Sequence, residues 1–365
     1  MKPLTIVIAG GGTGGHLYPG IAVARELLRR QPDAVITFAG TARGIEARVV
    51  PREGFALDVL RSAALKGTSP LALLRGIGLL PLSGFDAWQI LSRRRPDLVI
   101  GVGGYSSGPV MLAAAARGIP TLLLEQNAMP GLTNRLLARV VSAAAVTFES
   151  TVSFFGRRAF VAGNPIREEF LSTTAGNAAG NGGGGGAPPR VLIFGGSQGA
   201  HAINMAMVEA APRLADRGGV AITHQTGERD LERVRDGYRQ AGVVARIEPF
   251  LYEMDREMRD ADVIVCRAGA TTIAELTAAG KPSVLIPLPT AADDHQRKNA
   301  EVLQRAGAAE VMEQKDLSGV GLAERILALV GNADRRQRMA RAARTLARPD
   351  AARVIVDRAL ELARR

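Results

Sequence analysis

The sequence predicts an α/β protein built from two doubly wound parallel-sheet domains. Apolar runs of strand type alternate with helical patterns along the chain, which is typical of parallel sheets covered by helices. Two glycine-rich turns recur about half a chain apart, at residues 10–16 and 195–200, each after an apolar run and before an amphipathic one. The 365 residues exceed the size at which one hydrophobic core stops growing, so two domains are expected.

The apolar runs define the order of the elements. Strands are expected at residues 4–9, 34–39, 56–60, 97–102, 119–124, 143–148, 190–194, 220–225, 243–248, 262–266, 282–287 and 308–312. The first domain is expected to span residues 1–163 and the second residues 164–345. The glycine-rich stretch at 172–189 has no strand before it and predicts a flexible loop at the junction. Residues 346–365 include a helical pattern whose apolar face needs a surface to pack against.

Charge and cysteine content limit the class of protein. The net charge of +11 and the pI near 10.6 indicate anionic partners, namely nucleic acid, anionic lipid or phosphorylated substrates. Aromatic residues make up only 4% of the chain and nucleic-acid-binding motifs are lacking, so no nucleic acid partner is expected. The single cysteine, Cys266, excludes a disulfide framework and is expected to be buried on a strand. Met1-Lys2-Pro3 leads straight into a strand pattern, so a cytosolic product is expected.

The glycine-rich turns are suited to binding phosphate. Backbone N–H groups at the start of a helix lack helical partners, and the helix dipole favours negative charge there. Two such turns predict two phosphorylated ligands that meet in one cleft. Gly10, Gly12 and Gly15 also match the dinucleotide fingerprint, but the second strand does not end in the acid that binds ribose in NAD enzymes. Because Arg43 is compatible with NADP, an NADP-dependent oxidoreductase is the alternative function.

Six motifs in sequence order make the prediction specific. They are Gly11-Gly12-Thr13-Gly14-Gly15-His16, Gly103-Gly104-Tyr105 with Ser107-Gly108-Pro109, Glu125-Gln126-Asn127, Gly163-Asn164-Pro165 with Arg167, Gly195-Gly196-Ser197-Gln198-Gly199-Ala200, and Cys266-Arg267 with Gly269-Ala270. This series resembles the MurG family over nearly the whole chain. The resemblance implies the two-domain GT-B glycosyltransferase architecture, with the last helix returning to the first domain. It also implies transfer of N-acetylglucosamine from UDP-N-acetylglucosamine to lipid I, the undecaprenyl-linked muramyl-pentapeptide, to give lipid II, in an inverting reaction without metal or other cofactor.

For the second domain, the resemblance implies a site for UDP-N-acetylglucosamine. Ser197 and the amides from Gln198 onward would hold the pyrophosphate and stabilise the departing charge in place of a metal. Glu275 would accept both ribose hydroxyls, although Thr272-x-x-Glu275 is also the pattern of a capping box. Other donor contacts are expected at Phe250 and Leu251 for uracil, at Gln296 and His295 for the sugar, and at Ala270, Thr271, Thr272, Ile273 and Ala274. Asp260-x-Asp262 precedes its strand, so it is expected away from the ligand end of the sheet and not to bind a metal.

For the first domain, the resemblance implies the acceptor side of the reaction. Thr13, Gly14 and Gly15 are expected beside the transferred sugar and the acceptor pyrophosphate, and Gly12, Gly104, Tyr105 and Ser107 on the acceptor side. His16 is a candidate general base for the acceptor hydroxyl, since histidine titrates near neutrality, or it binds phosphate without moving protons. Glu125 is the alternative base, and Asn127 is expected to bond the sugar. Arg167 is expected near the donor, with a surface salt bridge as the alternative.

Residues 71–82 form an apolar stretch that is too short to span a bilayer and is interrupted by Arg75 and Pro81. The stretch is expected to lie in the membrane interface, with Lys66, Arg75 and Arg93-Arg94-Arg95 facing anionic headgroups. Apolar contacts are expected at Leu74, Ile77, Leu79, Leu80, Phe85 and Trp88, and a buried helical hairpin is the alternative. These expectations describe a peripheral protein on the cytoplasmic face of the inner membrane, with cell-wall assembly proteins as candidate partners.

Overall fold

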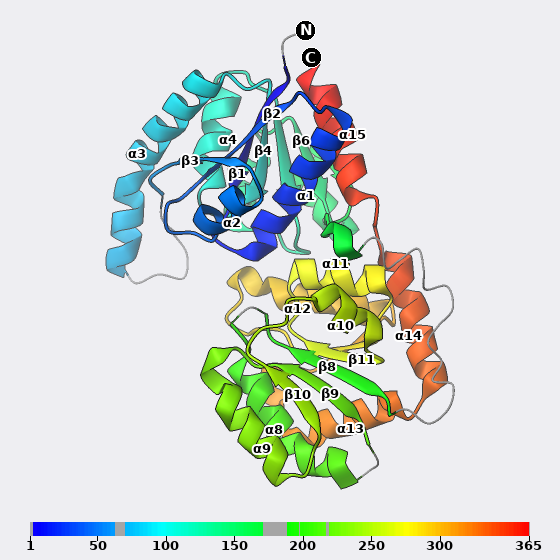
Figure 1. Cartoon of the computed structure of the whole chain (residues 1–365). Helices are drawn as coiled ribbons and strands as arrows, with labels where there is room; N and C mark the ends of the chain where they lie inside the picture. The colour runs from blue at the N-terminus through cyan, green and yellow to red at the C-terminus, as the bar shows by residue number, and fades with distance from the viewer. Residues whose placement is uncertain (1–2, 63–69, 171–187, 197, 217–218, 365) are drawn as a thin grey trace. The chain divides into compact units, whose positions relative to one another are not determined.

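The computed structural model describes residues 3–62, 70–170, 188–196, 198–216 and 219–364, and the side chains of residues 70–77 are outside that description. The chain divides into two compact units. The first unit comprises Met1–Arg167 with Arg348–Arg365, and the second comprises Glu168–Ala347. Each unit is a parallel sheet covered by helices (Figure 1), so the predicted fold class is confirmed. The loop expected at 172–189 lies almost wholly outside the described residues.

The first unit holds a seven-stranded sheet in the order β3-β2-β1-β4-β5-β6-β7, in which neighbouring strands pair in parallel. The strands are β1 Thr5–Gly10, β2 Val35–Gly40, β3 Ala56–Val59, β4 Leu98–Gly103, β5 Thr121–Glu125, β6 Ala143–Val146 and β7 Ala159–Val161. Strand β1 pairs with β2 through Ile6 and Ile36 and with β4 through Ile6 and Leu98. The chain order therefore reverses between β1 and β4, where ligands bind at the carboxyl ends of such sheets.

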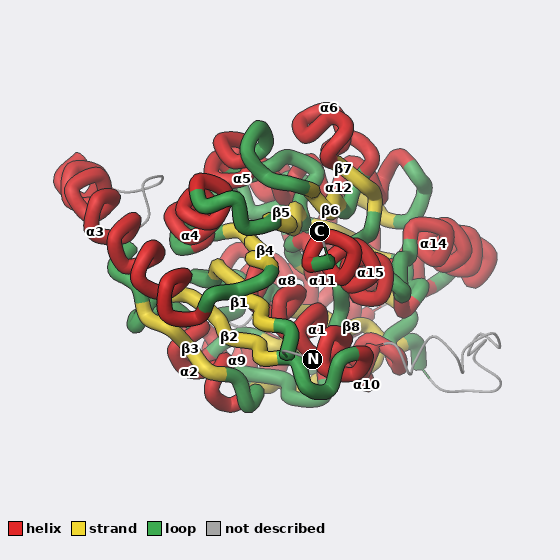
Figure 2. Tube along the Cα trace, turned by 90° about the horizontal axis from the view of Figure 1, so that it is seen from above, coloured by secondary structure: helices red, strands yellow, loops and turns green. Residues whose placement is uncertain are grey.

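Side chains of β1 alternate between two layers of the first unit. Ile6 and Ile8 pack with the layer that includes α1 and α15, whereas Val7 and Ala9 pack with the layer that includes α3 and α4. The helices are α1 Gly14–Arg30, α2 Glu46–Arg52, α3 Pro70–Arg94, α4 Ser107–Ala116, α5 Leu132–Leu137, α6 Val152–Phe155 and α15 Ala351–Ala363. Figures 1 and 2 both show α15 beside α1. The last helix thus completes the core of the first unit by burying Ile355, Val356 and Ala359.

The second unit holds a six-stranded parallel sheet in the order β10-β9-β8-β11-β12-β13. Its strands are β8 Arg190–Phe194, β9 Ala221–Gln225, β10 Ala245–Glu248, β11 Val263–Cys266, β12 Ser283–Leu285 and β13 Ala309–Val311. Its helices are α8 His201–Asp216, α9 Leu231–Gln240, α10 Met254–Asp260, α11 Ala270–Ala279, α12 His295–Arg305, α13 Gly319–Val330 and α14 Ala333–Leu346. Helices α8, α9 and α13 cover one face, and α10, α11 and α12 lie on the other (Figure 1). The chain order reverses between β8 and β11, so the second candidate ligand site lies at the loops that follow these two strands.

Every strand range expected from the sequence contains a strand, and its ends differ by no more than a residue or two. Strand β7 is not predicted by the sequence, because its short run lies between Arg157-Arg158 and Gly163. Cys266 is fully buried on β11, as expected. Among the described residues, the helices lack the combination of length and apolarity needed to cross a bilayer.

Candidate active site

Two glycine loops meet at the carboxyl ends of β1 and β4. A Cβ atom on Gly10 would lie 2.4 Å from the Gly103 carbonyl oxygen, and one on Gly104 would lie 2.4 Å from the Gly11 oxygen. Gly103 and Gly104 also have φ angles of +92° and +81°, which residues with side chains rarely adopt. The two loops therefore pack backbone against backbone. This contact brings Tyr105, whose Cε1 would lie 3.1 Å from a Cβ on Gly12, beside the first glycine loop.

Glu46, at the start of α2, lies beneath the first loop and was not among the candidate residues. One carboxylate oxygen accepts the Gly12 N–H at 2.8 Å, and the other accepts the Thr41 N–H at 2.9 Å and the Thr41 hydroxyl at 2.8 Å. Burial raises the pKa of Glu46, but these hydrogen bonds outweigh it and hold the pKa below its usual value. The buried carboxylate is thus ionised and occupies the Gly12 amide. The Gly12 N–H is already donated within the protein, and the acceptor-side role of Gly12 stays a prediction.

His16 lies in the first turn of α1, which begins at Gly14 with Thr13 as its N-cap residue. Its Nδ1 lies 3.1 Å from Oε1 of Gln126, and Nε2 of the same amide donates to the Val102 carbonyl at 3.0 Å. A Cβ on Gly103 would lie 2.9 Å from His16 Nδ1, so only glycine leaves room for the imidazole. The loops after β4 and β5 together fix the orientation of His16.

Glu125 ends β5 and is almost fully buried. Its Oε1 accepts the backbone N–H of Asn127 at 2.9 Å, and its Oε2 accepts the N–H of Gly131 at 3.2 Å and Nδ2 of Asn134 at 2.8 Å. Burial raises the pKa of Glu125 to about 7, while these hydrogen bonds act in the opposite direction. Both carboxylate oxygens are engaged by the loop that follows the strand, so Glu125 shapes that loop and places Asn127.

Arg167 lies at the end of the first unit. Its guanidinium carbon stands 5.8 Å from the centroid of the Tyr18 ring in α1. This contact associates Arg167 with α1, the helix that carries His16.

Ser107, predicted on the acceptor side, begins α4 and is fully buried.

In the second unit, the glycine loop joins β8 to the amino end of α8. Ser197 lies outside the described residues, whereas Gln198 is exposed and the Gly199 N–H donates to the Gly196 carbonyl at 2.8 Å. The loop therefore forms a tight turn at the start of a helix, the arrangement that the sequence predicts for phosphate binding.

Helix α11 carries the predicted ribose ligand. The helix begins at Ala270 with Gly269 as N-cap, and no side chain caps it. The capping-box alternative for Thr272 and Glu275 is therefore wrong, because Thr272 lies inside the helix. Glu275 is buried, and its negative charge adds to burial in raising the pKa of the Cys266 thiol at the end of β11. The carboxylate thus lies near the carboxyl end of the central strand.

Polar side chains of α12 connect the loops after β11 and β12. Oε1 of Gln296 accepts the N–H groups of Ala268 at 3.3 Å and Leu288 at 3.0 Å. These contacts consume the amide oxygen, so Gln296 would address a sugar through its Nε2 donors. His295 Nδ1 instead bonds the Ala292 carbonyl at 2.7 Å. Asn299, which was not among the candidates, is buried and donates to the Ala268 carbonyl at 3.2 Å.

The loop after β10 carries the residues predicted to contact uracil. Leu251 is buried, whereas Phe250 is 42% exposed. The Phe250 ring meets the exposed Tyr252 edge-on, with centroids 5.0 Å apart. An exposed aromatic ring beside a buried residue fits the expected contact with a planar base.

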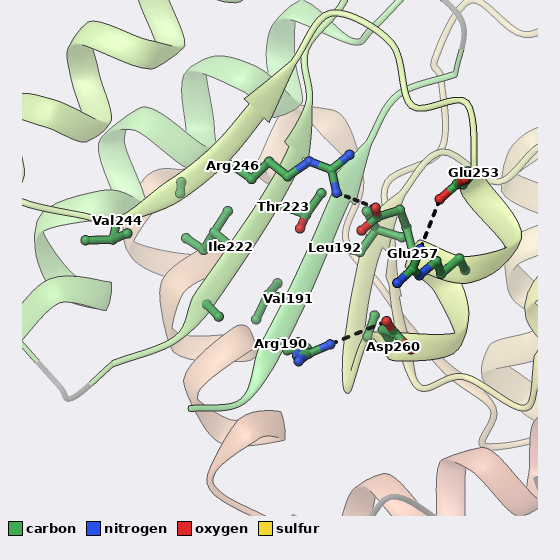
Figure 3. Close-up of a pocket in the computed structure, with 14 residues that line it drawn as sticks. Arg190, Val191, Leu192, Ile222, Thr223, Val244, Arg246, Glu253, Glu257 and Asp260 are labelled. Carbon is green, nitrogen blue, oxygen red and sulfur yellow. Dashed lines mark hydrogen bonds and ion pairs between the residues drawn. The ribbon is translucent and has the colours of Figure 1, made fainter. Parts of the chain in front are cut away.

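Figure 3 shows a cavity of about 490 Å³ in the second unit, between α10 and the amino-terminal halves of β8, β9 and β10. Arg246 pairs with Glu257 at 2.5 Å, and Arg190 pairs with Asp260 at 3.4 Å. The Asp262 carboxylate accepts the Arg190 N–H at 2.8 Å. The cavity and the Asp260-x-Asp262 pattern thus lie away from the carboxyl-end loops. Among the described residues, no cluster of three or more His, Cys, Asp or Glu side chains is arranged to hold a metal.

Helix α3 is continuous through Pro81, so the helical-hairpin alternative is wrong. Ala87, Ile90 and Leu91 bury one face in the core that includes α4, whereas Leu80, Phe85 and Trp88 are exposed and Leu79 is half-buried. Figure 2 shows α3 reaching outward from the sheet of the first unit. The side chains of Leu74, Ile77 and Arg75, and the whole of Lys66, lie outside the described residues.

Two basic residues at the end of α3 form ion pairs. Arg93 and Arg94 pair with the buried Asp58, at 2.6 and 2.8 Å, while the Arg93 side chain stays 64% exposed. That the run Arg93-Arg94-Arg95 faces headgroups stays a prediction. Arg117, the residue that follows α4, places its guanidinium 4.9 Å from the centroid of the Trp88 ring. Among the described residues, it thus brings cationic charge beside the exposed Trp88.

The glycosyltransferase family 28 N-terminal domain matches residues 6–146, and the glycosyltransferase family 28 C-terminal domain matches residues 190–355. The chain thus has two Rossmann-like sheets, each with a glycine loop at its switch point, and each half matches a glycosyltransferase family 28 domain. These features define a glycosyltransferase of the GT-B architecture. The NADP-dependent oxidoreductase alternative is not supported.

Individual relatives narrow the class. A protein of Anaeromyxobacter sp. (strain K) called UDP-N-acetylglucosamine--N-acetylmuramyl-(pentapeptide) pyrophosphoryl-undecaprenol N-acetylglucosamine transferase is 49% identical over 99% of this chain and 94% of that protein. A protein of the same name from Pelobacter propionicus is 48% identical over 98% of this chain and 99% of its own length. The crystal structure of Acinetobacter baumannii MurG superposes with a TM-score of 0.78 and 32% identity, covering 98% of this chain and 100% of that one. The chain belongs to the MurG family.

Proposed function

We propose that this enzyme transfers N-acetylglucosamine from UDP-N-acetylglucosamine to the muramyl sugar of lipid I, giving lipid II, with inversion and without a metal. The observation that carries the proposal is the pair of glycine loops, one at the switch point of each parallel sheet. It is supported by 49% identity to the Anaeromyxobacter protein called UDP-N-acetylglucosamine--N-acetylmuramyl-(pentapeptide) pyrophosphoryl-undecaprenol N-acetylglucosamine transferase. An acceptor hydroxyl attacks the anomeric carbon, the bond to UDP breaks, and the hydroxyl proton passes to a base.

The donor is assigned to the second unit. The turn at Gln198 and the start of α8 receive the diphosphate, and Ser197 is retained as a predicted contact. Glu275 accepts the ribose hydroxyls, Phe250 and Leu251 meet uracil, and Gln296 donates to the sugar. His295 is a weaker candidate than Gln296, because its Nδ1 is held by a carbonyl of its own turn. The remaining donor contacts are assigned to the first turns of α11, at Ala270, Thr271, Thr272, Ile273 and Ala274.

The acceptor is assigned to the first unit. Because Glu46 takes the Gly12 amide, the acceptor pyrophosphate is directed to the start of α1, at Thr13, Gly14 and Gly15. Gly104, Tyr105 and Ser107 belong to the neighbouring loop and helix α4. Arg167, over Tyr18, is assigned to the donor.

His16 is the proposed general base. Its Nδ1 proton is committed to Gln126, so proton transfer from the acceptor uses the Nε2 lone pair. The Glu125 carboxyl, although its pKa of about 7 suits a base, is enclosed by its own loop. Its proposed role is to hold Asn127 for contact with the transferred sugar.

The exposed face of α3, formed by Leu80, Phe85 and Trp88, is proposed to lie in the anionic surface of the cytoplasmic membrane leaflet, where the lipid-linked acceptor resides. Cell-wall assembly proteins remain candidate partners.

A radiolabel transfer assay tests the proposal. UDP-N-acetylglucosamine and vesicle-embedded lipid I are incubated with the enzyme, with and without EDTA, and the anomeric configuration of the product is determined by NMR. Full activity in EDTA and an inverted linkage are expected. Strict dependence on added metal or a retained configuration would reject the mechanism, and absence of transfer would reject the assigned reaction.

A further inference from the structure

The segment after β9 lies directly behind the second-unit glycine loop. Nε2 of Gln225 donates to the Gly196 carbonyl at 2.9 Å. A Cβ on Gly199 would lie 1.8 Å from the Thr226 carbonyl oxygen, and one on Gly227 would lie 2.3 Å from the Gln198 oxygen. The two turns thus touch through their backbones, and Gln225 ties them together by a hydrogen bond.

Asn204, in the first turns of α8, holds this segment in place. Its Nδ2 donates to the Thr226 carbonyl at 2.9 Å and to the Asp230 carboxylate at 2.8 Å. The side chain is almost fully buried. Asp230 also accepts from Nδ1 of His201, at 2.9 Å, so the start of α8 is tied to the start of α9. Asn204 therefore connects the helix that follows the glycine loop to the turn behind that loop.

A buried histidine sets the orientation of Asn204. His224 Nε2 lies 3.1 Å from Asn204 Oδ1, and His224 Nδ1 lies 2.8 Å from the Tyr238 hydroxyl. Burial lowers the pKa of His224 to about 3, so the ring is neutral at physiological pH. Because Asn204 uses Nδ2 as donor, its oxygen must accept the Nε2 proton of His224, and Nδ1 then accepts the hydroxyl proton of Tyr238. The direction of each hydrogen bond from Tyr238 through His224 to Asn204 is therefore fixed.

We propose that Asn204, Gln225 and His224 are positioning residues for the donor diphosphate. This inference rests on the proposed function of the loop. A loop rich in glycine has few side chains of its own to fix its backbone, so amides that receive phosphate must be held from behind. Gln225 holds the Gly196 carbonyl and Asn204 holds the Thr226 carbonyl, while His224 orients Asn204. These bonds keep the loop preorganised before UDP binds and while charge develops on the leaving group.

The test compares the affinity for UDP with that for uridine, which lacks phosphates. Asn204→Ala and Gln225→Ala are expected to weaken UDP binding about tenfold, the usual effect of leaving buried partners without hydrogen bonds, and to leave uridine binding unchanged. They are also expected to lower kcat, because the same loop stabilises the departing diphosphate. Titration calorimetry for UDP and competition for uridine measure the ratio of the two affinities at a temperature well below unfolding.

Val234→Ala is the matched control, since Val234 is a fully buried apolar residue of α9 in the same core. It is expected to lower the melting temperature without changing the ratio of UDP to uridine affinity. If Asn204→Ala does not fold, the ratio of UDP to uridine affinity is measured for Gln225→Ala and Tyr238→Phe instead. Equal losses of UDP and uridine binding, or an unchanged ratio, would overturn the inference. A wild-type enzyme that does not prefer UDP to uridine would overturn the donor assignment and the inference with it.

Discussion

The imidazole of His16 donates a hydrogen bond to the side-chain amide of Gln126. Nδ1 of His16 lies 3.1 Å from Oε1 of Gln126, and Nε2 of Gln126 is committed to the Val102 carbonyl at 3.0 Å. An amide oxygen only accepts, so neutral His16 carries its proton on Nδ1 and its lone pair on Nε2. The pair joins α1 to the loop after β5, and it selects the tautomer that a general base requires.

Replacing Gln126 with Glu is expected to move the pH profile of the reaction. A carboxylate beside Nδ1 stabilises the imidazolium form, so the acidic limb of the kcat profile should shift upward by about one pH unit or more. The profile is measured with saturating donor and acceptor between pH 5 and pH 9.

Gln126→Met is the control for that experiment. It removes the acceptor without adding charge, so kcat should fall by about 10- to 100-fold while the acidic limb moves little. An acidic limb that stays in place in Gln126→Glu would show that His16 is not the base.

Glu46→Gln is expected to destabilise the first unit. The amide would place an NH₂ group against the N–H donors of Gly12 or Thr41, at a cost of about 1–3 kcal/mol in the free energy of unfolding. Urea unfolding can be followed through Trp88, the single tryptophan of the chain, which lies in the first unit.

The pH dependence of this difference has a defined sign. The pKa of Glu46 is lowered from its ordinary value of 4.5, so its stabilising contribution is complete above pH 4.5 and is lost as the pH falls through the lowered pKa. The gap between wild type and Glu46→Gln should therefore be full at pH 7 and shrink below pH 4.5. A gap that is constant across this range would argue against an ionised Glu46.

The sequence predicted most strands because their signal is local. An apolar run such as Val263–Cys266 identifies a strand wherever its partners lie. The glycine loops were found for the same reason. Residues whose role depends on distant partners were missed, since Glu46 is separated from Gly12 by 34 positions and His224 from Asn204 by 20. The local pattern Thr272-x-x-Glu275 left a capping box open as an alternative, and the fold excludes it because Gly269 is the N-cap of the helix that begins at Ala270.

Glu275→Gln is expected to reduce discrimination between UDP and 2′-deoxy-UDP. A carboxylate that accepts both ribose hydroxyls contributes charge-assisted hydrogen bonds, so the variant should lose about tenfold or more in affinity for UDP and much less for the deoxy analogue. Thr277→Val is the control and should retain the preference, because Thr277 is a buried neighbour on α11 whose hydroxyl donates to the Ala274 carbonyl of the same helix. Equal losses for both nucleotides would assign Glu275 a structural role.

The exposed face of α3 is expected to govern membrane binding. Leu80→Ser with Phe85→Ser removes two apolar side chains that are 45% and 57% exposed, and burying such side chains in a lipid interface is worth about 1.5–3 kcal/mol each at most. Cosedimentation with vesicles containing anionic lipid should fall by about tenfold or more, while transfer to a water-soluble acceptor analogue persists. Leu136→Ser is the matched control, because Leu136 on α5 is 71% exposed but lies on another helix. If that single change lowers vesicle binding as much as the double change on α3, the enzyme meets the membrane through a different surface, because exposure alone would then fail to distinguish the two helices.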